Sequence, residues 1–152
     1  MFETINDIKP EKNDSRMLGA LAYAGAIIIG VFAPLLIYLL AKDDKFARFH
    51  GLQMLLTEII LLTVCMVVFM VGWIAWMLMF FMFPIGASTM PGDGAVFGLL
   101  FFVIFIIFFL IMIIFMLAGF LWLLLKIYLA YLAYQGKAFR LPFVTKFVLK
   151  NI

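Results

Sequence analysis

Three long apolar stretches, almost free of charge, constrain this chain of 152 residues more than any other feature. They cover 17–41, 52–83 and 96–134, and only Glu58 and Lys126 interrupt them. A helix of ~20 apolar residues is long enough to cross a bilayer core of ~30 Å. The pattern therefore predicts an all-α integral membrane protein with three transmembrane helices.

The composition excludes the soluble classes of protein. Hydrophobic residues make up 68% of the chain and charged residues only 12%, against ~25% charged in ordinary soluble domains. The single cysteine, Cys65, excludes a disulfide framework, and one cysteine with one histidine excludes a Cys/His zinc site. We expect 1–152 to form a single membrane domain, with a polar tail at 1–16.

Turn-forming residues divide the rest of the chain. A cluster of glycine and proline between 84 and 95 makes the second and third spans a long antiparallel hairpin. Pro34 is expected to kink the first span. After the stop signal Gln135-Gly136, the segment 137–152 predicts a basic amphipathic helix in the membrane interface, with Val144, Phe147 and Val148 on its apolar side and Thr145 on its polar side.

Small residues recur in the first span at steps of three and four, which allows helices to approach closely in lipid. They are Gly19, Ala22, Ala26, Gly30 and Ala33. The pattern fits packing onto the hairpin within one chain, or self-association of two chains.

The distribution of lysine and arginine predicts the orientation. Three lie in the tail, three in the first connector, four after residue 136, and none in the loop between the second and third spans. With three spans, the positive-inside rule places the C-terminus in the cytoplasm and the N-terminus outside, in the cytoplasmic (inner) membrane of a cell.

Polar side chains inside the second span form a stripe. His50, Gln53, Thr57 and Glu58 fall on one helix face, which should point at protein or water. Lys126 of the third span is the expected partner of Glu58 or Thr57. The two charges either satisfy each other, or Lys126 extends to the headgroups, or the pair moves a proton, ion or polypeptide.

The sequence has no motif typical of a nucleotide, metal, hydrolase or protease site. We therefore expect no enzymatic activity, no cofactor and no nucleic-acid partner, and no small-molecule substrate is identified.

Two segments carry a family resemblance. The first is 45–53, with Arg48, Phe49, His50 and Gln53, and the second is 130–142, with Gly136, Arg140 and Pro142. Together they resemble the Tic-twenty-like family, which includes a chloroplast inner-envelope import component and small bacterial and archaeal membrane proteins. The resemblance implies three helices with both segments on the inner face, and a role in a protein translocon.

Three functions remain open on this basis. The first is a non-enzymatic subunit that supports translocation, insertion or assembly of other proteins, with a membrane-protein partner. The second is an oligomeric pore for protons, cations or small solutes, formed by several copies of the chain. The third is a structural or lipid-organising membrane protein whose partner is the bilayer itself.

Overall fold

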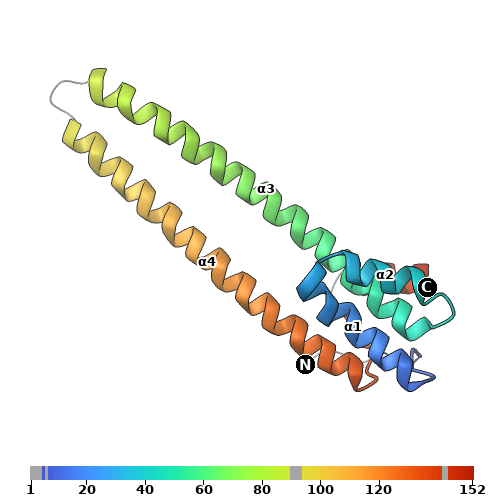
Figure 1. Cartoon of the computed structure of the whole chain (residues 1–152). Helices are drawn as coiled ribbons and strands as arrows, with labels where there is room; N and C mark the ends of the chain where they lie inside the picture. Colours follow the sequence, from blue (N-terminus) through green and yellow to red (C-terminus); the bar gives the residue numbers. More distant parts are fainter. Residues whose placement is uncertain (1–4, 6, 90–93, 142–143) are drawn as a thin grey trace. The chain divides into compact units, whose positions relative to one another are not determined.

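The computed structural model describes residues 5, 7–89, 94–141 and 144–152, and within them the regular elements are helices (Figure 1). They are α1 (Asn13–Ile29), α2 (Phe32–Leu40), α3 (Lys45–Thr89), α4 (Gly94–Tyr134) and α5 (Val144–Asn151). The helical prediction is confirmed for these residues.

The chain divides into two compact units. Unit 1 contains Met1–Leu62 and Leu121–Ile152, and unit 2 contains Thr63–Phe120. All eleven lysine and arginine residues belong to unit 1, whereas Asp93 is the one charged residue in the sequence of unit 2. The long helices α3 and α4 each contribute to both units.

The first apolar stretch is broken at Gly30, so the prediction of one helix over 17–41 is wrong. Gly30 adopts φ 59° and ψ −134°, a conformation that only glycine enters readily. The chain reverses there, and α1 and α2 pack against each other (Figure 1). A Cβ on Gly25 would lie 2.7 Å from the Cβ of Ala33, which shows how closely the two helices approach. The predicted kink at Pro34 is also wrong, because Pro34 lies in the first turn of α2, where its missing N–H costs nothing.

Glycines set the spacing between helices in unit 1. A Cβ on Gly19 of α1 would lie 2.9 Å from the Phe46 ring, and one on Gly51 of α3 would lie 2.9 Å from the backbone nitrogen of Tyr38 in α2. Ala22 and Ala26 are buried in the same core. Of the small residues of the first stretch, all but Gly30 therefore pack within the chain.

Caps and backbone hydrogen bonds fix the ends of the helices. Asp44 Oδ1 accepts a hydrogen bond from the Ala47 N–H at the start of α3. At the end of α4, Gly136 has φ 77°, and the N–H groups of Gly136 and Lys137 bond to the carbonyls of Ala133 and Leu132. This is the Schellman arrangement that the Gln135-Gly136 stop signal favours.

The N-terminal tail is joined to the segment that follows α4. The Ile5 N–H donates a hydrogen bond of 2.7 Å to the Ala138 carbonyl. Ile5 and Ala138 also share a hydrophobic cluster with Phe46, Phe49 and Val148. The beginning of the chain and its last segments therefore belong to one folded unit.

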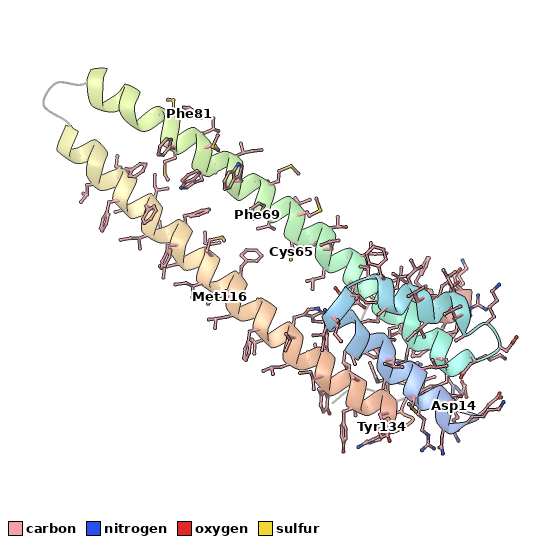
Figure 2. All side chains as sticks on the ribbon, viewed as in Figure 1. Asp14, Cys65, Phe69, Phe81, Met116 and Tyr134 are labelled. Atoms are coloured by element: carbon pink, nitrogen blue, oxygen red, sulfur yellow. The ribbon has the colours of Figure 1, made fainter. Side chains whose placement is uncertain are left out.

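Unit 2 is an antiparallel pair formed by the second part of α3 and the first part of α4 (Figure 1). Its described side chains are mostly apolar and largely exposed, including Phe69, Phe81 and Met116 (Figure 2). A groove of about 530 Å³ within this unit is lined by apolar side chains and Cys65. Such a surface suits lipid rather than water.

Two helices in the described chain are long and apolar enough to cross a membrane, over Lys45–Met82 and Gly98–Tyr134. These agree with the second and third predicted spans. The 9-residue helix α2, ~13 Å long, is too short to cross.

The turn at Gly30 provides a test of the fold. Gly30→Ala should lower the free energy of unfolding by about 1–3 kcal/mol, because a side chain at this positive φ is strained. Gly98→Ala is the matched control, since Gly98 is helical, open space surrounds it, and alanine favours helix. Unfolding in detergent micelles measures both variants. Equal stabilities would contradict the assigned turn.

Candidate functional site

The centre of unit 1 contains two of the predicted polar residues. His50 and Gln53 lie one turn apart on α3, and both side chains are fully buried. A buried polar group is costly unless it is hydrogen-bonded, so its partners define the site.

The Gln53 amide joins three other parts of the chain. Its Nε2 donates to the Phe139 carbonyl at 3.0 Å and to Thr145 Oγ1 at 2.9 Å. Its Oε1 accepts a hydrogen bond of 3.0 Å from the Tyr23 hydroxyl. Every hydrogen-bonding position of this amide except one lone pair is therefore used.

These contacts assign the protonation of His50. The Tyr23 hydroxyl lies 3.0 Å from His50 Nδ1, but its single proton already goes to Gln53. Nδ1 must therefore carry a proton and donate to the Tyr23 oxygen. In the neutral ring, Nε2 is then an unprotonated acceptor, and this buried atom has no hydrogen-bond partner among the described residues.

Aromatic rings enclose the imidazole. The centroids of Phe46, Phe49, Phe139 and Tyr23 lie 4.5, 5.1, 5.3 and 5.6 Å from that of His50. Because the rings offer little solvation to an added charge, this environment favours the neutral imidazole.

Thr145 corrects the prediction for the C-terminal helix. Its hydroxyl is buried, accepts hydrogen bonds from Gln53 and from the Leu141 N–H, and donates to the Leu141 carbonyl. Val144 and Val148 are buried beside it, whereas Phe147 is 57% exposed. The helix docks on unit 1 by a face that includes Thr145, because the Gln53 amide offers it a partner.

The remaining residues of the polar stripe lie farther along α3. Thr57 turns its hydroxyl back to the Gln53 carbonyl at 2.7 Å, in the same helix. Lys126 Nζ lies 2.5 Å from Glu58 Oε1, with both side chains nearly buried. The expected ion pair forms, and Lys126 is also 6.0 Å from the centre of the Trp122 ring. A role of this pair in moving a proton, ion or polypeptide stays a prediction.

The residues of the two resemblance segments have structural positions. Phe49 is fully buried, and the Arg48 guanidinium lies 5.0 Å from the centre of the Tyr38 ring. Gly136 forms the turn after α4, and Arg140 is exposed. Pro142 lies outside the described residues.

Sequence reasoning missed Tyr23, Thr145 and the Phe139 carbonyl. A signal existed for Tyr23, because Tyr23 and Tyr38 are the only residues between 17 and 41 with a polar side chain. No local pattern marks a backbone carbonyl 86 residues from its partner. Within the described residues, no group of three His, Cys, Asp or Glu side chains is placed to hold a metal ion.

Removal of one hydroxyl tests the buried cluster. Tyr23→Phe should destabilise the protein by about 1–3 kcal/mol, because it leaves the His50 N–H and the Gln53 carbonyl oxygen unpaired. Tyr134→Phe is the control, since Tyr134 is 59% exposed. Thermal unfolding in detergent compares them, and equal midpoints would show that the hydrogen bonds contribute nothing.

A double-mutant cycle tests the ion pair. Glu58→Gln and Lys126→Met should each destabilise the fold, and the double variant should lose less than the sum of the two, because neither charge is then left alone. Glu58→Gln combined with Lys146→Met, at an exposed position of α5, should give additive losses. Additivity in both cycles would contradict the pair.

Comparison with known proteins identifies the family. No curated protein and no solved structure was found to match the chain. A model of the MamF/MmsF family, described as the magnetosome magnetite crystal formation protein family, matches residues 14–148. This match overturns the Tic-twenty-like resemblance, which rested on two short segments, and leaves the translocon role without support. Since the match covers most of its length, the chain belongs to the magnetosome magnetite crystal formation protein family, MamF/MmsF.

Proposed function

We propose that this protein is a non-enzymatic component of the magnetosome membrane that supports the formation of magnetite crystals. The family match over residues 14–148 is the observation that carries the proposal. The two long apolar helices supply the means of residing in a bilayer. The protein would act there through its place in the membrane and its contacts.

We further propose that only α3 and α4 cross the membrane. This differs from the three-crossing prediction, and three contacts support it. The tail reaches the C-terminal segment through the Ile5–Ala138 hydrogen bond, and α1 reaches α5 through Tyr23, Gln53 and Thr145. The tail and the segment after α4, which these contacts hold together, belong on the same side of a bilayer.

The charge distribution fits two crossings better than three. With two crossings, the tail, the first connector and the C-terminal segment share one side, which then holds ten of the eleven lysine and arginine residues, the exception being Lys126 within α4. The connection between α3 and α4 holds none. The positive-inside rule then places both termini in the cytoplasm and this connection in the compartment where the crystal grows.

Impermeant labelling tests the topology. In a Cys65→Ser background, Lys12→Cys, Lys42→Cys and Lys150→Cys place single thiols at exposed positions. All three should react with a membrane-impermeant maleimide from the cytoplasmic side only. Reaction of Lys12→Cys from the side opposite to Lys150→Cys would establish three crossings and refute the proposal.

Deletion of the protein in a magnetite-forming host tests the function. Crystals should become smaller or fewer by electron microscopy, and the intact chain should restore them. A complementing Tyr134→Phe chain is the control for expression of a substituted protein. Normal crystals in the deletion strain would contradict the proposed role.

A further inference from the structure

The outer surface of the α1–α2 pair is apolar and exposed, which is unusual for a soluble protein. No residue between 17 and 41 is charged. Along α2 the exposed residues Phe32, Leu36 and Leu40 recur on one face, with exposed fractions of 64%, 50% and 79%. At the end of α1, Ile28 is 84% exposed. Ile28 and Phe32 flank the turn at Gly30, so the closed end of the pair is apolar as well as its sides.

The other end of the pair is charged. Asp14 lies in the first turn of α1 (Figure 2). Arg16 is two residues farther along, and Lys42, Asp43 and Asp44 follow α2. The pair is thus polar at its open end and apolar at its closed end. A helix pair lying flat at a membrane surface would instead need a polar face along its whole length.

The lengths match half of a bilayer. From Met17 to Ile29, α1 rises ~18 Å, and α2 rises ~13 Å, whereas one leaflet of a ~30 Å core is ~15 Å deep. Gly30 confines the break between the helices to two residues, 30 and 31. This keeps the stretch of non-helical backbone short, which limits the number of backbone N–H and C=O groups without a partner in hydrocarbon.

We propose that α1 and α2 form a wedge inserted into a single leaflet, with Ile28 and Phe32 among the acyl chains and the charged end at the headgroups. The proposal rests on the two-crossing topology. The wedge adds volume to the cytoplasmic leaflet and none to the other. In a vesicle with unit 1 outside, this is the convex leaflet. The protein therefore favours membrane that is convex on its cytoplasmic side.

Depth-dependent quenching tests the insertion. Single thiols at Ile28→Cys, Val67→Cys and Lys12→Cys, in the Cys65→Ser background, carry a fluorophore in vesicles of phosphatidylcholine and phosphatidylglycerol. The Ile28 label should be quenched by lipids with a nitroxide on the acyl chain and protected from iodide, as the Val67 label in α3 is. Iodide quenching as strong as at Lys12, with Lys12 and Lys42 labelled from the same side, would refute the wedge and leave the topology intact. Labelling of Lys12 and Lys42 from opposite sides would refute both.

Vesicle shape tests the consequence. The full chain is added from detergent to preformed vesicles, which keeps unit 1 outside, and diameters are measured by electron cryo-microscopy at equal protein-to-lipid ratios. The intact protein should give smaller diameters than the Ile28→Asn/Phe32→Asn variant. Leu149→Asn, at an exposed apolar residue of α5, is the control and should behave as the intact protein. Equal diameters for all three would overturn the curvature effect.

Discussion

Unit 1 depends on the hydrogen bonds of the Gln53 amide. Through three hydrogen bonds the amide connects α3 to α1, to the segment after α4 and to α5. These segments are far apart in sequence, and the Gln53 amide joins them all to α3. In a buried setting each of these bonds is costly to lose, since the group left behind has no water to replace it. The cluster therefore selects one arrangement of the chain's ends from the many that hydrophobic packing alone would allow.

This constraint decides how the first apolar stretch folds. Tyr23 must reach Gln53 near the start of α3, and Gly51 must accept the backbone of α2 at close distance. A single helix from Met17 to Ala41 could not make both contacts. It would hold Tyr23 and Tyr38 far apart along its axis, whereas Gln53 and Gly51 lie only two residues apart on α3. The reversal at Gly30 is thus required by the packing of unit 1. Its result is a pair of short helices, α1 and α2, in place of one helix over 17–41.

The two units divide the chemistry of the protein between them. Unit 1 contains the buried polar cluster, the Glu58–Lys126 pair and all the basic residues, while unit 2 is an apolar helix pair with a lipid-like surface.

The sequence by itself predicted the membrane class, the long α3–α4 hairpin, the turn at Gln135-Gly136 that ends α4, and Lys126 as the partner of Glu58 or Thr57. Each follows from local hydropathy, turn-forming residues or the cost of a charge in lipid, and these can be read from residues close together in the sequence. Only the tertiary structure decided that 17–41 forms two helices, that Tyr23 and Thr145 complete the cluster around Gln53, and that Ile5 contacts Ala138. These depend on partners far apart in the sequence, such as Gln53 and Thr145, which are 92 residues apart. The hydropathy pattern does not predict these contacts, because an apolar stretch has the same pattern whether it packs against protein or against lipid.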